Sequence, residues 1–92
     1  MIKSFRHKGL KDFFETGSKR GITAEMATRI RIRLDVIDAA KTVADVNLPG
    51  FRLHELKGQR VETWSVWVSG NYRLTFRFKG NDAYDVDLED YH

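Results

Sequence analysis

Residues Trp64 to Phe78 read WSVWVSGNYRLTFRF, and this stretch decides the fold of the chain. Apolar residues alternate with polar ones on both sides of Gly70-Asn71, a dipeptide typical of a tight turn between two strands. The same period of two recurs after the loop at Pro49, in residues 51–56, 61–69, 72–79 and 83–91. This pattern predicts four strands in a mostly antiparallel sheet over the second half of the chain.

The first half of the chain has a helical period instead. Leu10, Phe13 and Phe14 predict a short helix that ends at Gly17. A second helix, with Thr23 as its N-cap, is predicted by an apolar stripe with steps of three and four residues. The members of that stripe are Ala24, Ala27, Ile30, Leu34, Ile37 and Ala40. We expect one α+β domain over residues 1–92, in which two N-terminal helices pack on a sheet of four to five strands, with residues 2–5 as the optional edge strand.

The alternation also predicts a register for the last two strands. A three-residue connection, Gly80 to Asp82, keeps the apolar faces matched. The predicted cross-strand pairs are then Arg77 with Asp85, Thr75 with Asp87, Arg73 with Glu89 and Asn71 with Tyr91. The face toward the helices would hold Tyr84, Val86 and Leu88. This register anchors the last strand and brings the chain terminus beside Asn71.

Composition narrows the classes of function. The formal net charge is +3, but residues 1–33 hold nine Lys or Arg against three acidic residues, whereas residues 81–92 hold five acidic residues and no Lys or Arg. A basic region of this kind favours a polyanionic partner such as nucleic acid. With no cysteine, the chain has neither disulfides nor a thiolate metal site. No apolar run approaches the ~20 residues of a membrane helix, so we predict a cytoplasmic protein without a metal or cofactor.

No glycine-rich phosphate loop, His-x-x-x-His pair or nucleophile elbow is present in the sequence. The remaining reactive groups are dispersed: His54, Lys57, Asn71, Arg73, Asp90, Tyr91 and His92. Imidazole can transfer protons near neutral pH, and guanidinium and ammonium groups can stabilise a phosphate. Such a set suits a metal-free ribonuclease, in which side chains move protons and hold the scissile phosphate. Each group also has an ordinary structural explanation, such as an ion pair between Arg73 and Glu89.

Three segments together resemble the HigB toxins, the plasmid-maintenance killer branch of the RelE superfamily. They are GFRLHELKG (residues 50–58), WSVWVSGNYRLTFRF (residues 64–78) and DAYDVDLEDYH (residues 82–92), and the opening MIKSFRHKGLKDFFETG is similar too. The resemblance implies a RelE-like fold with a curved sheet. It also implies the toxin of a type II toxin–antitoxin system, a ribosome-dependent endonuclease that cuts mRNA in the A site. The implied partners are the 70S ribosome, mRNA and a HigA-like helix-turn-helix antitoxin, through which alone the toxin would reach operator DNA.

The resemblance assigns roles to the dispersed residues. His54 and Lys57 lie in the LHELKG match, Asn71 and Arg73 in GNYRLTF, and Asp90, Tyr91 and His92 in the terminal DYH. His92, supported by Asp90, is implied as one acid–base group and His54 as its counterpart. Lys57 and Arg73 would stabilise phosphate, while Tyr91 and Asn71 would orient the message. Which imidazole is the general base is left open.

Two other classes of function remain open from the residues. One is a ParE-like toxin of the same fold that inhibits DNA gyrase and cuts nothing. The other is a non-catalytic nucleic-acid-binding module that uses Arg29, Arg31 and Arg33 of the predicted second helix.

Overall fold

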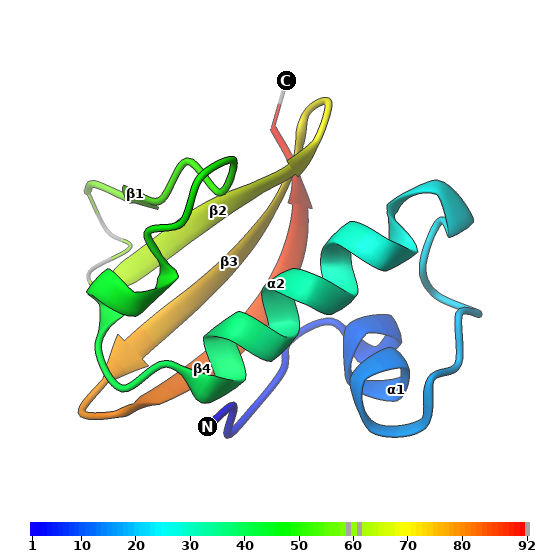
Figure 1. Cartoon of the computed structure of the whole chain (residues 1–92), viewed down its shortest axis with the longest axis horizontal. Helices are drawn as coiled ribbons and strands as arrows, with labels where there is room; N and C mark the ends of the chain where they lie inside the picture. Colours follow the sequence, from blue (N-terminus) through cyan, green and yellow to red (C-terminus); the bar gives the residue numbers. More distant parts are fainter. Residues whose placement is uncertain (59, 61, 92) are drawn as a thin grey trace.

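The computed structural model describes residues 1–58, 60 and 62–91. Two helices, α1 (Lys8–Thr16) and α2 (Ala27–Ala39), precede four strands: β1 (His54–Glu55), β2 (Thr63–Ser69), β3 (Tyr72–Lys79) and β4 (Asp82–Asp90). The strands form one sheet in the order β1-β2-β3-β4, and each neighbouring pair is antiparallel. Figure 1 shows α2 lying across the sheet and α1 beside it. The predicted α+β architecture, helices first and sheet second, is confirmed. In this described part of the chain, no helix is long and apolar enough to cross a membrane.

Both ends of α1 are fixed by local chemistry. The His7 side chain caps the first turn, since its Nδ1 accepts a hydrogen bond from the Leu10 amide at 3.0 Å. Gly17 follows the last turn with φ 80°, a left-handed conformation that glycine adopts without strain, and its N–H donates to the Phe13 carbonyl. The predicted stop at Gly17 is confirmed. The cap at His7 was not predicted from the sequence.

The apolar stripe of α2 forms one half of the core. Ile30, Leu34 and Ile37 are fully buried, and each such side chain contributes roughly 1.5–3 kcal/mol relative to an exposed one. The sheet supplies the other half with Val66, Val68, Leu74, Phe76, Ala83 and Val86, all fully buried. The predicted cap was wrong: Thr23 precedes the short 3-10 turn Ala24–Met26, and its side chain makes no capping hydrogen bond.

The predicted register of β3 and β4 holds at one end only. Arg73 opposes Glu89 and Thr75 opposes Asp87, as expected. Arg77, however, opposes Tyr84 rather than Asp85. The turn is one residue shorter than predicted, because β4 already begins at Asp82.

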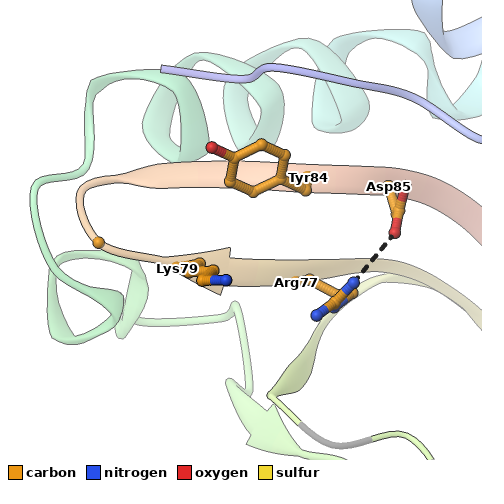
Figure 2. Close-up of a pocket in the computed structure, with 5 residues that line it drawn as sticks. Arg77, Lys79, Tyr84 and Asp85 are labelled. Carbon is orange, nitrogen blue, oxygen red and sulfur yellow. Dashed lines mark ion pairs between the residues drawn. The ribbon is translucent and has the colours of Figure 1, made fainter.

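A β-bulge absorbs the shift, with Asp85 at φ 54°. Tyr84 therefore shares the polar face with Arg77 instead of facing the helices. Bulging leaves the Asp85 carboxylate close to Arg77 all the same, and the two form an ion pair at 3.8 Å (Figure 2).

The N-terminal segment covers the free edge of β4. Ile2 and Phe5 form isolated parallel bridges with Ala83 and Val86, and the Lys3 amide donates to the Ala83 carbonyl at 2.7 Å. Residues 2–5 therefore lie at the predicted edge without forming a regular strand. Paired backbone groups at this edge are no longer available to another chain.

The segment predicted as a strand over 51–56 is regular only at His54–Glu55. Arg52 has φ 50°, a left-handed backbone conformation that interrupts an extended strand. The chain before β1 is therefore a loop, and its Arg52 carbonyl accepts a hydrogen bond from Arg73 on the polar face of the sheet. This loop carries His54 to the candidate site.

Candidate active site

An open groove of about 650 Å³ lies on the polar face of the sheet, away from the helices. Residues of the loop before β1, of β1 itself, of β2 and β3, and of the chain terminus contribute to its walls. The lining residues are Arg52, Leu53, His54, Leu56, Ser65, Arg73 and Tyr91. Segments as far apart as residues 52 and 91 thus meet at one site. In Figure 1, the end of β4 (red) lies beside the turn between β2 and β3 (yellow).

The groove unites three of the seven residues expected from the sequence, namely His54, Arg73 and Tyr91. Asn71 acts through its backbone, because its carbonyl accepts the Tyr91 amide at 2.7 Å. This hydrogen bond confirms the predicted pairing of Asn71 with Tyr91. Lys57 and Asp90 are exposed and do not line the groove. The predicted His92 lies outside the described residues.

Arg73 does not form the ion pair with Glu89 that the sequence suggested. Its Nε donates to the Ser65 hydroxyl at 2.8 Å, and its Nη2 donates to the Arg52 carbonyl at 2.7 Å. Burial lowers the pKa of the Arg73 guanidinium, Tyr91 acts in the opposite direction, and the like charge of Arg52 lowers it further. Guanidinium groups stay protonated in proteins. Among the described residues, the acceptors that hold Arg73 are uncharged, which leaves its positive charge available to an anion.

Glu89 is directed elsewhere, to Arg60. Its carboxylate accepts from both terminal nitrogens of Arg60 and from the Thr75 hydroxyl. Burial by itself would raise the pKa of Glu89, but the hydrogen bonds from Arg60 and Thr75 and the charge of Arg60 bring it below the ordinary value. The same hydrogen bond to Glu89 raises the pKa of Arg60. A bidentate pair of this kind is among the strongest hydrogen-bonded contacts between side chains.

Arg60 also positions Tyr91, because its Nη1 donates to the phenol oxygen at 2.8 Å. With its amide bound to Asn71 and its phenol bound to Arg60, Tyr91 is held at both ends. The prediction that the last strand is anchored at its end is confirmed. The anchor is Arg60 rather than Arg73. Nothing in the sequence pattern singled out Arg60, which lies between the quoted segments, or Ser65, which lies in the segment 64–78 without a role assigned to it.

The three arginines of α2 all make contacts within the fold, although Arg29 and Arg31 remain exposed. Arg33, expected off the apolar stripe, is only 7% exposed, and its Nε donates to the Trp67 carbonyl at 2.6 Å. Arg29 donates to the Val68 carbonyl at 3.1 Å. Arg31 lies over the Phe14 ring and pairs with Asp35. These contacts tie the sheet and α1 to α2, which weakens the hypothesis of a binding module built on the helix.

A second hollow, of about 510 Å³, lies on the same strand at the other end of β3. It is lined by Arg77, Lys79, Gly80, Tyr84 and Asp85. Figure 2 shows Arg77 and Lys79 on one strand and Tyr84 and Asp85 on the next, with Asp85 paired to Arg77. Of the expected site residues that the structure describes, none lines it. The groove at Arg73 is therefore the candidate active site.

Similarity to known proteins agrees with this geometry. Residues 3–92 match a family described as the RelE-like toxin of the type II toxin–antitoxin system HigB. The chain belongs to this family. Its sequence is also 48% identical over 92 residues to the protein named Endoribonuclease HigB of Proteus vulgaris, and the match covers 100% of both chains. The resemblance drawn from the three sequence segments is confirmed, and the groove can be considered as the site of a HigB-like toxin.

Proposed function

We propose that this HigB-like toxin is an endoribonuclease that cleaves mRNA on the ribosome, with the groove as its active site. The observation that carries the proposal is the state of Arg73. Within the described residues it is held by a hydroxyl and carbonyls, and it stands in one groove with His54 and Tyr91. A half-buried, charged fork with uncharged partners suits a scissile phosphate. The full-length similarity to a protein named as an endoribonuclease supports the same activity.

The proposed reaction is attack of a ribose 2′-oxygen on the adjacent phosphorus. A base takes the 2′-hydroxyl proton, the bond to the 5′-oxygen breaks, and an acid protonates the leaving oxygen. The products are a 2′,3′-cyclic phosphate and a 5′-hydroxyl. His54 and His92, the latter supported by Asp90, are the proposed proton carriers in either order. Arg73 and Lys57 would stabilise the charge that develops on phosphorus, and Tyr91 and Asn71 would orient the message.

Dependence on the ribosome is part of the proposal, and the open shape of the site supports it. The groove is open, and a strand of RNA can enter it in many orientations. Holding the message in one geometry removes the entropic cost of finding the reactive orientation. We propose that the ribosomal A site supplies this orientation. A HigA-like helix-turn-helix antitoxin, which alone would carry the toxin to operator DNA, and a cytoplasmic location complete the proposal.

Mapping of RNA ends tests the function. One message is prepared in a translated copy and in a copy without a start site, the toxin is induced, and new 5′ ends are located by primer extension. We expect ends within codons of the translated copy alone. Growth arrest without new ends contradicts the nuclease, and inhibited gyrase supercoiling in the same cells would instead support the ParE-like alternative. Equal cleavage of both copies would refute ribosome dependence.

Independence from metal is a separate proposal with its own test. A message with a phosphorothioate at the scissile bond is cleaved more slowly when a metal ion binds the replaced oxygen, and a thiophilic ion such as Mn²⁺ then restores the rate. We expect no such restoration by Mn²⁺. Restoration would show that a metal ion takes part in the cleavage step.

A further inference from the structure

We propose that Arg52, held over the ring of Trp67, is a second phosphate-binding subsite of the groove. It would take a backbone phosphate of the same RNA strand, next to the scissile one, and it therefore rests on the function proposed above. Four features of the structure support it: the place of Trp67, the stacking of Arg52, the surrounding charge and the backbone of residue 52.

Trp67 stands beside the proposed catalytic machinery. It is the cross-strand partner of Arg73 in the β2–β3 register, so both side chains leave the sheet on the polar face. The indole Nε1 donates to the Gly70 carbonyl at 2.9 Å, which fixes the ring. Trp67 is half-buried. It is a rigid platform at the margin of the groove.

Arg52 uses this platform. The centre of its guanidinium lies 4.4 Å from the centroid of the Trp67 ring, and Arg52 is itself a lining residue of the groove. Stacking engages the flat face of a guanidinium and leaves the N–H groups on its edge for other acceptors. Arg52 is exposed. Its donors are therefore pre-oriented by the ring and still open to an anion.

The surroundings of Trp67 are strongly positive. Arg29 lies 5.5 Å from the same ring, and Arg73 is opposite on β3. Among the described residues, the ion pairs include none of Arg29, Arg52 and Arg73. The like charge of Arg52 contributes, after burial, to the lowered pKa of Arg73. A phosphate between these groups would offset their repulsion.

The backbone of Arg52 links the two cationic groups. Arg52 has φ 50°, a conformation that costs free energy for a residue with a side chain and persists only where neighbours hold it. Here the Arg52 carbonyl accepts the Arg73 guanidinium at 2.7 Å. The same strained residue thus positions Arg73 through its carbonyl and offers its own side chain to the groove. Both cations face the groove that also holds His54 and Tyr91. We therefore infer that the occupant is the RNA strand of the proposed reaction and not an acidic segment of a protein partner.

Binding of an uncleavable RNA tests the subsite separately from cleavage. The probe is a labelled trinucleotide with 2′-O-methyl riboses, followed by fluorescence anisotropy at several salt concentrations. Arg52→Ala is expected to raise Kd about tenfold, as for loss of one hydrogen bond to a charged group. It should also reduce the slope of log K against log salt by roughly 0.7, the value for one phosphate contact on a single strand.

The matched control is Arg31→Ala, which removes the same charge from a guanidinium stacked over Phe14, 5.4 Å from the ring centroid. Its Kd and salt slope should stay within about twofold of the wild-type values. Arg52→Gly is the second variant, because glycine adopts the left-handed conformation of residue 52 without strain. It should fold at least as well as wild type and bind as weakly as Arg52→Ala. Thermal unfolding of each variant verifies the fold.

Several results would overturn the subsite. They are equal affinities of the Arg52 and Arg31 variants, an unchanged salt slope, and no measurable binding by the wild type. A loss confined to the affinity for the antitoxin, with RNA affinity intact, would assign the surface to the protein partner instead. The proposed nuclease activity fails differently, since the wild type would then bind the probe and yet produce no new ends on a translated message.

Discussion

Arg73 and Arg77 lie four residues apart on the same face of β3, and each has an acidic residue near it on β4. Arg77 forms an ion pair with the nearby Asp85 at 3.8 Å. At Arg73, the opposing Glu89 is bound instead by Arg60 and Thr75. The two ends of β3 therefore differ in which group binds the acidic side chain of β4.

The difference shows how this fold provides an anion site on a strand of alternating charge. A cation opposite an acid is normally neutralised across the sheet. The loop before β2 supplies Arg60, which removes Glu89 from Arg73 and at the same time fixes Tyr91. Within the part of the chain that the structure describes, the guanidinium at the groove end of β3 thus has no acidic partner. The bulge end keeps an ordinary surface ion pair.

Substitution of Arg73 should have the largest effect. We expect Arg73→Ala to slow message cleavage about 10²–10³-fold, the range for loss of one donor to a charged transition state. Arg77→Ala is the matched control on the same strand and should change the rate less than about twofold. Rates come from quantified cleavage ends in a reconstituted translation reaction. Equal losses in the two variants would erase the distinction between the ends of β3.

Removal of His92 tests the terminal imidazole. We expect a chain that ends at Tyr91 to lose most of its cleavage activity while its unfolding temperature changes little, because an end residue contributes few packing contacts. The comparison is with an otherwise identical chain in which His92 is replaced by Gln. Full activity of either variant would leave His54 as the sole imidazole for the reaction.

Arg60 has an intermediate expected effect. In Arg60→Ala, the Glu89 carboxylate loses its partner and can turn to Arg73, so cleavage should fall about tenfold and the free energy of unfolding by about 1 kcal/mol. The expected loss of unfolding free energy is small because the Arg60 side chain is 40% exposed, and solvent weakens the ion pair. Adding Glu89→Gln to Arg60→Ala should restore part of the activity. If the double variant is no better than Arg60→Ala, Glu89 does not act on Arg73.

Acid titration reports on the same pair with a smaller effect. The folded-state pKa of Glu89 lies below its ordinary value of 4.5. Its contribution to stability is therefore fully present above that value and is lost as pH falls through the lowered folded pKa. Glu89→Gln should flatten the fall in unfolding free energy as the pH drops below 4.5. The comparison is with the wild-type chain, and parallel curves for the two proteins would contradict the assignment.

The smallest expected effect is on stability at Arg77. Its side chain is 48% exposed and that of Asp85 is 42% exposed, and exposed pairs contribute roughly 0.2–1 kcal/mol. Arg77→Ala should lower the unfolding free energy by less than that upper value in denaturant titration. A loss clearly above about 1 kcal/mol would show that the pair of Arg77 and Asp85 stabilises the fold more than an ordinary surface ion pair does.

The sequence by itself determined the order of the elements, the two faces of β2 and β3 and the approach of the terminus to Asn71. Local periodicity suffices for this, because a period of two or of 3.6 fixes which side chains share a face. The chemistry of the side chains and the family resemblance also identified His54, Arg73 and Tyr91 as candidate site residues.

Only the tertiary structure decided which partners these groups take. One residue fewer in the turn and a bulge at Asp85 moved Tyr84 to the polar face. The loop before β2 delivered Arg60 to Glu89, and the left-handed backbone of residue 52 delivered its carbonyl to Arg73. Loops and bulges have no period, and contacts between distant segments depend on their shape. The sequence pattern therefore could not show that Glu89 binds Arg60 and Thr75 rather than Arg73.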